Sequence, residues 1–225
     1  MRLPEILTRS SAPPEAEAEP TVRRRRVVVL ATTVVGAALL GGTLAAPVGS
    51  GLFYGFGVLV AATWLVGGRV SGPLHLGRRG GRVGASREVV APLLLGVALF
   101  AAFAGAALVA RRIPFLAGAV ESVLARADSG PRAFVLALAL INGVAEEVFF
   151  RGALHTAFGR HRPALWSTAL YALVTVATLN LALVVAAVVM GVAFSAEREA
   201  TRGILAPVIT HVTWSTLILF LLPRG

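Results

Sequence analysis

The sequence predicts an all-α protein, a polytopic bundle of about seven transmembrane helices. Of its 225 residues, 56% are hydrophobic and only 14% are charged, whereas soluble proteins carry about 25% charged residues. The apolar residues form long runs without the strict alternation of a β-barrel, and only helices or closed barrels span lipid. The chain has no cysteine, which excludes disulfides, thiolate metal ligands and a cysteine nucleophile.

The charge pattern supports this class. The net charge is +10, and every basic residue is an arginine. The arginines cluster between the apolar runs, which is the positive-inside pattern of membrane proteins, so we expect the lipid bilayer and no nucleic acid as the partner. The lack of lysine points to a GC-rich bacterial genome. We therefore expect a multi-pass protein of the bacterial plasma membrane with a cytoplasmic N-terminus.

The N-terminal part divides at a basic block. Residues 1–22 are rich in Pro, Ala and Glu and lack a periodic apolar face, which predicts a disordered cytoplasmic tail. Residues 23–131 are predicted to form the N-terminal membrane helices. Four arginines precede the first apolar run, which is longer than the core of a signal peptide, so we expect a retained first span. Predicted here are spans at 27–46, 52–66 and 91–110, a basic cytoplasmic loop at 69–88, and an amphipathic interfacial stretch at 115–126.

Residues 132–222 are predicted to form a second helix bundle. Pro131 and Pro163 stand where proline favours a helix start, and Asn180 marks a tight turn. A charged group that begins at Glu197 ends the sixth span. The predicted spans are 132–150, 164–179, 181–195 and 204–222.

Two adjacent acids, Glu146 and Glu147, lie within the apolar run of the fourth span. A charge inside the bilayer is costly, which makes these acids functional candidates. Glu147 and Arg151 have the i,i+4 spacing of a helical ion pair. Glu146 points about 100° away on the helical wheel and lacks that partner, so it is a candidate proton acceptor. With Arg151, Arg160 and Arg162 marking the cytoplasmic boundary, we expect Glu146 about one to two turns from it, in a pocket that opens to the cytoplasm.

Three further groups of polar residues lie near or within the predicted spans. His155 is expected at the interface, where it would extend the Glu147–Arg151 pair. His211 shares one helix face with Pro207 and Ser215, as a pocket wall or as a packing histidine bonded between helices. The fifth span carries a hydroxyl stripe that either lines a site or bonds back to its own helix. The stripe consists of Thr168, Tyr171, Thr175 and Thr178.

Two motifs resemble those of the CAAX protease and bacteriocin-processing family, also called the abortive-infection family. These are intramembrane proteases related to the type II CAAX prenyl endopeptidase. AEEVFFRG at 145–152 is similar to the glutamate-glutamate-x-x-x-arginine signature of that family. GILAPVITHVTWS at 203–215 is similar to its final motif, in which a histidine is followed four residues later by asparagine. The resemblance covers residues 132–222, which we therefore predict to be the catalytic bundle.

The resemblance implies a role for each matching residue. Glu146 would be the general base, Glu147 and Arg151 would support it, and His211 would donate a hydrogen bond to the oxyanion. Two positions depart from the family: Thr175 stands where a histidine is expected, and Ser215 where an asparagine is expected. Serine still donates a hydrogen bond, but threonine is no base near neutral pH, and a positioned acid–base group is worth about 10² to 10⁴ in rate. The resemblance implies no certain cofactor, and it leaves open a divalent metal, for which the sequence has no complete ligand set.

Three functions follow. The first is an intramembrane endopeptidase that hydrolyses peptide bonds near the cytoplasmic membrane face with a water activated by Glu146. Its substrate would be a membrane-associated peptide or protein. The alternative, which Thr175 favours, is a degenerate relative that binds a membrane partner or peptide without cleaving it. The third is a proton-coupled carrier, against which the single carboxylate cluster and the missing internal repeat both argue.

Overall fold

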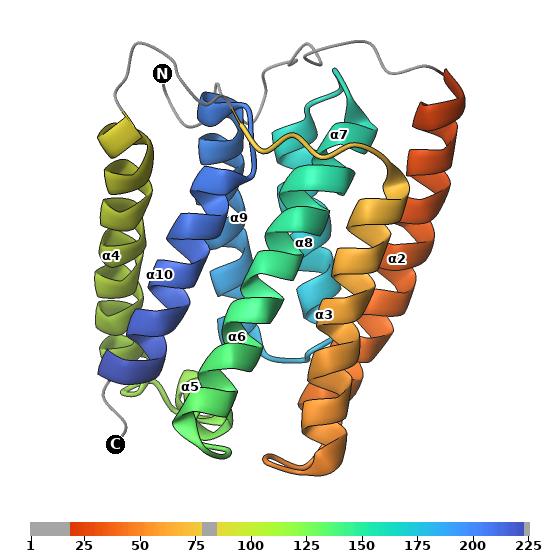
Figure 1. Cartoon of the computed structure of the whole chain (residues 1–225). Helices are drawn as coiled ribbons and strands as arrows, with labels where there is room; N and C mark the ends of the chain where they lie inside the picture. Colours follow the sequence, from red (N-terminus) through yellow and green to blue (C-terminus); the bar gives the residue numbers. More distant parts are fainter. Residues whose placement is uncertain (1–18, 78–84, 223–225) are drawn as a thin grey trace.

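The computed structural model describes residues 19–77 and 85–222, and all regular elements there are helices (Figure 1). The bounds are α2 Glu19–Ala45, α3 Gly51–Ser71, α4 Ala85–Ala110, α5 Pro114–Ala127, α6 Arg132–Glu146, the π-helix η1 Glu147–Leu154, α7 His155–Phe158, α8 Pro163–Val176, α9 Leu181–Thr201 and α10 Leu205–Leu221. The prediction of an all-α bundle is confirmed.

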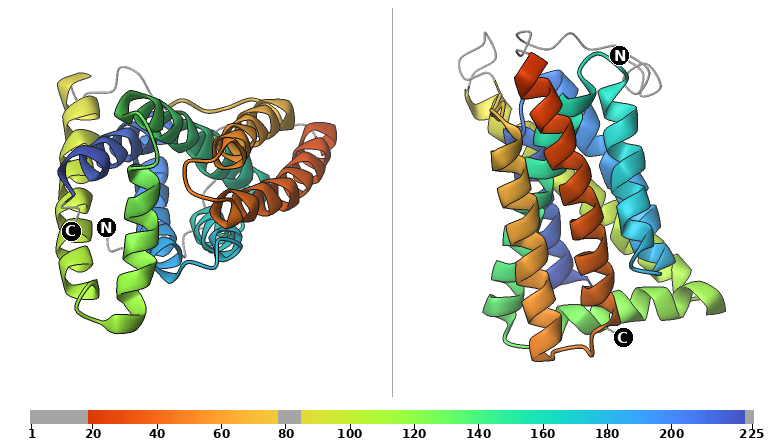
Figure 2. Two further views of the ribbon diagram at one scale, coloured as in Figure 1. Left: turned by 90° about the horizontal axis from the view of Figure 1, so that it is seen from below. Right: turned by 90° about the vertical axis from the view of Figure 1, so that its right-hand side faces the viewer.

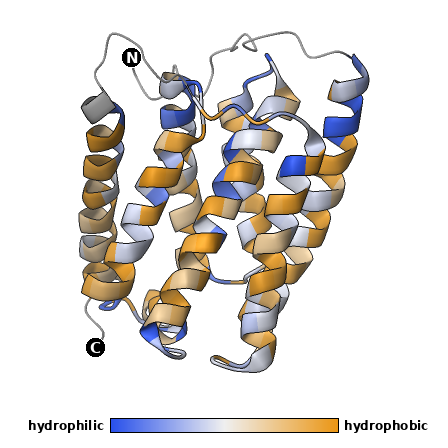
Figure 3. Cartoon of the chain, viewed as in Figure 1, coloured by the Kyte–Doolittle hydropathy of each residue, from blue (hydrophilic) through white to orange (hydrophobic). Residues whose placement is uncertain are grey.

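Five helical stretches of the described chain are long and apolar enough to cross a membrane. They are Glu19–Ala45, Gly51–Ser71, Glu88–Ala110, Arg132–Phe158 and Leu181–Thr201. Two shorter apolar helices, α8 and α10, complete the bundle, in agreement with about seven predicted spans. Hydrophobic residues cover most of the helices, and hydrophilic residues gather near the helix ends (Figure 3). The chain is a membrane protein.

The first helix begins earlier than the sequence predicts. Residues 19–22, assigned to the disordered tail, form the first turn of α2, while the rest of that tail, 1–18, lies outside the described residues. The arginine block explains the difference, because its guanidinium groups donate to carbonyls of neighbouring segments. Arg24 donates to Val70 O at 2.5 Å, and Arg25, fully buried, donates to Pro73 O at 3.0 Å. Part of the predicted basic loop, 78–84, is also outside the described residues.

The fourth span is longer than the sequence predicts, and this moves the two glutamates. α6, η1 and α7 follow one another without a break from Arg132 to Phe158. The side chain of Arg151, which with Arg160 and Arg162 was expected to mark the membrane boundary, is 0% exposed within the bundle. Burial is tolerated because the charge is paired with Glu147 inside the bundle. Glu146 therefore lies in the middle of a continuous helical run, about 18 Å by helical rise from its end.

The helices pack tightly in the half of the bundle that contains the start of α2. Trp64 of α3 stacks on Phe149 with ring centroids 4.7 Å apart and also contacts Phe150. These three side chains are at most 1% exposed. A Cβ on Gly68 would lie 2.6 Å from a methyl group of Val148, so glycine permits the close approach of α3 to η1. This packing fixes the position of the π-helix.

The opposite end of the bundle is covered by α5, which lies across the ends of the other helices (Figure 2). The Asn180 side chain ties α5 to the turn before α9, because its amide donates to Ala119 O at 2.9 Å. The same side chain caps α9 by accepting from the Leu183 backbone amide, so the predicted turn at Asn180 is confirmed. The amphipathic stretch predicted at 115–126 is the helix α5.

Candidate active site

The carboxylate of Glu147 is the centre of a buried polar cluster in the middle of the bundle. Its Oε1 accepts a hydrogen bond from Arg151 Nη1 at 3.1 Å, so the predicted ion pair is confirmed. The same oxygen lies 2.9 Å from Nδ1 of His211 on α10. Glu147 and Arg151 are fully buried, and His211 is 6% exposed. A hydrogen bond at Nδ1 orients the imidazole and leaves Nε2 as its other functional nitrogen.

The segment that carries these residues is a π-helix. The turns of a π-helix are wider, and their backbone hydrogen bonds join residues five positions apart instead of four. Side chains from other segments donate hydrogen bonds to two of the carbonyl oxygens in this π-helix. Ser167 donates to Phe150 O at 2.7 Å, and Arg198 Nε donates to Arg151 O at 2.9 Å. Both side chains are buried. These bonds hold Glu147 and Arg151 in place from α8 and α9.

Aromatic rings enclose the cluster. The Arg151 guanidinium lies over the Tyr171 ring at 4.6 Å and the Phe194 ring at 5.1 Å. Phe194 also packs against the imidazole of His211, with centroids 5.0 Å apart. Arg151 Nε and Nη2 are buried without a hydrogen-bond partner among the described residues. The ring faces supply cation–π attraction in place of those partners.

Glu146 occupies a different environment from its neighbour. The Tyr171 hydroxyl donates to Glu146 Oε2 at 2.7 Å. The glutamate is half-buried and lines a cavity of about 310 Å³ that Ser215 also lines. His211, whose Nδ1 is bonded to Glu147, is not among the residues that line this cavity. A Cβ on Gly143 would lie 3.2 Å from the imidazole, so this glycine lets α10 bring His211 close to α6.

The hydroxyl groups of the α8 stripe bond to different partners. Thr175 donates to the Tyr171 carbonyl at 2.8 Å, four residues earlier in its own helix, and is not among the residues that line the cavity. Thr178 bonds to Thr175 O, and Thr168 bonds to Ser195 of α9. For Thr175, the interpretation of a hydroxyl bonded back to its helix is therefore correct. The member of this stripe that contacts the two acids is Tyr171, which donates to Glu146.

His155 is placed differently from its prediction. Its Nε2 lies 2.9 Å from Glu199 Oε1 of α9, and the ring is 6% exposed. It does not extend the Glu147–Arg151 pair, because the π-helix and α7 turn it toward the end of α9. Its expected position at the membrane interface stays a prediction.

Sequence reasoning missed several residues of this site. Sequence reasoning gave Tyr171 no role at the site, although this aromatic residue lies one helical turn before Thr175. Glu197 was interpreted only as a charge at a span end, but its Oε1 accepts from Thr210, the neighbour of His211, at 2.7 Å. Phe194 and Trp214 gave no polar signal in an apolar helix. Their roles depend on which helices meet.

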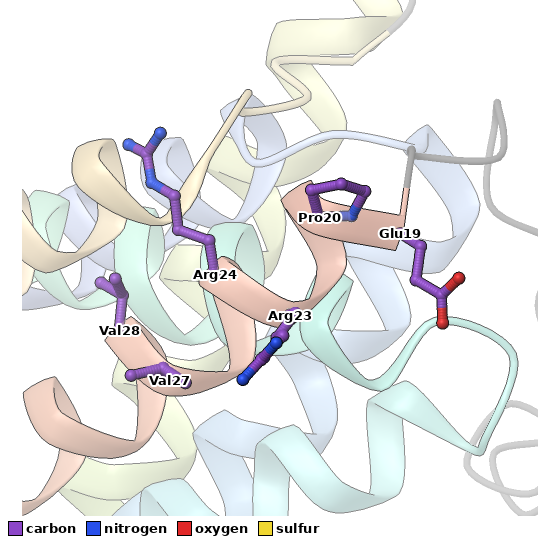
Figure 4. A pocket seen from close by; sticks show the side chains of 6 residues that line it. All are labelled: Glu19, Pro20, Arg23, Arg24, Val27 and Val28. Carbon is purple, nitrogen blue, oxygen red and sulfur yellow. The ribbon is translucent and has the colours of Figure 1, made fainter.

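The described residues contain no group of three or more His, Cys, Asp or Glu side chains placed to hold a metal ion. The cluster around Glu147 instead combines acids with one imidazole and one guanidinium. A second hollow, about 610 Å³, lies beside the start of α2 (Figure 4). It is lined by Glu19, Pro20, Arg23, Arg24, Val27 and Val28, and none of the predicted site residues reaches it.

Residues 128–217 match the family model described as "Rce1-like: Type II CAAX prenyl endopeptidase Rce1-like". The match covers 90 of the 225 residues, and this part of the chain is similar to that family. The resemblance found in the two motifs is thereby confirmed, and both motifs lie within the matched residues. No curated protein and no solved structure matches the chain. With its apolar helices, the Rce1-like segment indicates an intramembrane protease of the CAAX type.

Proposed function

We propose that this protein is an intramembrane endopeptidase in which Glu146 deprotonates a water that attacks a peptide carbonyl. The proposal is supported by the different surroundings of the two adjacent acids Glu146 and Glu147. The carboxylate of Glu147 is bonded to Arg151 and His211, whereas Glu146 lines a cavity. A general base must reach the water that it activates, and Glu146 is the acid of this pair that borders such a space.

The remaining residues take supporting roles. Glu147 orients the His211 imidazole through Nδ1, which leaves Nε2 for the oxyanion that forms when water attacks. Ser215 lines the cavity beside Glu146 and would be a second oxyanion donor. Preorganised donors of this kind are typically worth about 10² to 10³ in rate each. Arg151 pairs with Glu147 and holds its carboxylate in place.

The proposed substrate is a membrane-associated peptide or protein, and the proposed location is the bacterial plasma membrane with the N-terminus in the cytoplasm. The arginines at the start of α2 and before α8 support this orientation by the positive-inside rule. The expected pocket open to the cytoplasm does not fit this orientation, because the cavity beside Glu146 extends toward α5, at the end of the bundle opposite the start of α2. We therefore propose cleavage in the middle of the membrane. Residues 132–222 would form the catalytic bundle, surrounded by the helices of 23–131.

The test is peptide cleavage by the full chain in proteoliposomes, read by mass spectrometry of a peptide library. Glu146→Gln is expected to lower the rate by about 10² to 10⁴ while the melting temperature stays near that of the wild type. Glu121→Gln, an exposed acid on α5, is the matched control and should leave the rate unchanged. Cleavage that persists in Glu146→Gln would remove this residue from the mechanism.

Thr175 supports the second candidate, a binding protein without cleavage. Its hydroxyl is bonded to its own helix, and no imidazole occupies its place. Thr175→His separates the two functions. A strong gain of cleavage would indicate that the rest of the site is intact, whereas peptide binding without a gain would favour the degenerate relative.

A further inference from the structure

We propose that Glu197 of α9 holds a proton in the folded protein and, through Thr210, positions His211. Glu197 is a partly buried acid that the proposed mechanism leaves without a role. The statement about His211 rests on the proposed function, because that function gives the imidazole its part in the reaction. The protonated state of Glu197 is independent of it.

The evidence for the proton is the number of hydrogens at the Thr210 hydroxyl. Thr210 Oγ1 lies 3.0 Å from the Pro92 carbonyl oxygen of α4 and 2.7 Å from Glu197 Oε1. Both distances are those of O–H···O hydrogen bonds, but a hydroxyl has one hydrogen and donates once. The Pro92 carbonyl has no hydrogen, so the second one comes from Glu197. As a carboxylic acid, Glu197 donates to Thr210 Oγ1, and Thr210 donates to Pro92 O.

The second oxygen of Glu197 agrees with an uncharged acid. Oε2 is buried and has no hydrogen-bond partner in the described part of the chain. A charged oxygen without a partner is costly to bury, whereas a neutral one costs much less. Among the described residues, no arginine or histidine lies within ion-pair distance of Glu197.

The charged groups around Glu197 bond to one another instead. The charged and titratable side chains on the surrounding elements are Glu88 of α4, Glu147 and Arg151 of η1, His155 of α7, Arg198 and Glu199 of α9, and His211 of α10. Arg151 is paired with Glu147, and Arg198 donates to the Arg151 carbonyl. The two histidines lie 2.9 Å from acids other than Glu197. Each of these basic groups thus has its own acceptor, and none of them is a counter-ion for Glu197.

Glu197 shares one face of α9 with two residues that contact the site. Phe194 and Arg198 lie four positions apart, and Glu197 lies three positions after Phe194, which places all three on the same side of the helix. Phe194 packs against the His211 ring, with centroids 5.0 Å apart. Arg198 donates to Arg151 O. Glu197 adds a bond to the residue that precedes His211.

Thr210 joins three helices next to His211. Its side chain is 0% exposed, and its two bonds reach α4 and α9. A Cβ on Gly96 would lie 2.9 Å from the Thr210 carbonyl oxygen, so this glycine lets α4 approach α10 here. The two bonds therefore fix α10 one residue before the imidazole. When Glu197 loses its proton, Thr210 donates to the carboxylate and its bond to Pro92 is lost.

Infrared spectroscopy of the full chain in detergent, near neutral pH, tests the proton. The difference spectrum between the wild type and Glu197→Gln should contain the C=O band of a carboxylic acid, which a carboxylate lacks. Thr210→Val should shift that band, because it removes the acceptor of the proton. Thr213→Val, which removes a hydroxyl bonded to Ile209 O of its own helix, is the matched control. A carboxylate signal instead, or no shift in Thr210→Val, would overturn the inference, and the shift alone decides it when Glu197→Gln does not fold.

Cleavage tests the positioning role. Glu197→Met, which keeps the size and cannot donate, should lower kcat by about fivefold, the effect of one hydrogen bond, with little change in KM. Glu197→Gln keeps a donor for Thr210 and should retain more of the rate than Glu197→Met. As pH rises through the range in which the acid band disappears, the wild type should lose rate relative to Glu197→Gln, because only the glutamate ionises.

The outcomes separate this inference from the proposed function. An unchanged kcat in Glu197→Met, or a constant ratio of wild type to Glu197→Gln across that pH range, would overturn the positioning of His211. An acid band in a protein that cleaves no peptide would leave the proton on Glu197 standing and reject the protease.

Discussion

The two halves of the bundle differ in how the space between the helices is used. The half that contains the start of α2 is filled by Trp64, Phe149 and Phe150, which are at most 1% exposed. The half next to α5 contains a cavity of about 310 Å³. Glu147 belongs to the filled half, and Glu146 lies where the filled half meets the cavity. Two identical side chains, adjacent in sequence, thus have different environments because they face different halves.

This difference suggests that one part of this helical run holds the site in place and the other part borders the space for a substrate. Dense packing around the π-helix keeps Glu147, Arg151 and His211 fixed, which is what a preorganised site requires. The cavity leaves space for a water and a substrate beside Glu146. If the comparison is correct, substitutions in the filled half should mainly reduce stability, and substitutions around the cavity should mainly reduce activity.

The largest effect is expected from breaking the buried ion pair. Arg151→Met leaves Glu147 as a buried charge without its cation, and we expect a loss of about 3 to 5 kcal/mol in the free energy of unfolding, together with loss of cleavage. Denaturant titration in detergent would measure it. Arg112→Met, an exposed arginine at the other end of the bundle, should change stability by less than about 0.5 kcal/mol. Equal effects of the two substitutions would contradict a structural role for the buried pair.

The second prediction compares the same substitution in the two halves. Leu154→Ala in the filled half, where the side chain is 2% exposed, should cost about 3 to 5 kcal/mol, because it opens a void in dense packing. Leu138→Ala at the cavity wall should cost only about 1 to 2 kcal/mol, because the space beside it is already open. Thermal unfolding of both variants would measure the difference. A larger loss for Leu138→Ala would indicate that the cavity is filled in the working protein.

The third prediction concerns Tyr171, which belongs to both halves. Tyr171→Phe keeps the ring over Arg151 and removes only the hydroxyl that donates to Glu146. We expect the cleavage rate to fall by roughly tenfold, from the loss of one hydrogen bond to a carboxylate, with little change in melting temperature. Tyr54→Phe removes a half-buried hydroxyl that bonds to Ser129 O elsewhere in the cavity wall, and it should change the rate less than Tyr171→Phe because it does not bond to Glu146. An unchanged rate in Tyr171→Phe would show that Glu146 needs no such donor.

The smallest effect is expected at the carbonyls of the π-helix. Ser167→Ala removes the donor to Phe150 O and should lower the free energy of unfolding by about 1 kcal/mol. Thr216→Val removes a hydroxyl that bonds to the Val212 carbonyl of its own helix, and the expected change is below about 0.5 kcal/mol. Chemical denaturation of both variants tests this comparison. Equal losses would mean that the π-helix does not depend on its external donors.

Part of the site could be predicted because it depends on spacing along one helix. The Glu147–Arg151 pair follows from the i,i+4 rule and is present in the structure. The order of the two family motifs was also readable in the sequence, and the family match covers both. The common face of His211 and Ser215 required only helical periodicity. Such features are fixed by covalent distance and helical geometry, whatever the neighbouring helices do.

Other features depend on which helices meet, and the sequence could not reveal them. Sequence reasoning treated Arg151 as a membrane boundary, whereas an acid from its own helix and rings from α8 and α9 make its burial tolerable. The partner of His211 is Glu147, and the partner of His155 is Glu199. These contacts join residues far apart in sequence, so local patterns carry no signal for them.

The sequence by itself determined the membrane class, the helices, the ion pair and the family motifs, because hydropathy and helical spacing are local properties of the chain. The tertiary structure alone decided that Glu146 borders a cavity while Glu147 is enclosed, and that the cavity extends toward α5. The physical reason is that a cavity is the space that several helices leave between them. Its position depends on side chains from α2, α3, α5, α6 and α10 together, and on the dense packing that closes the other half.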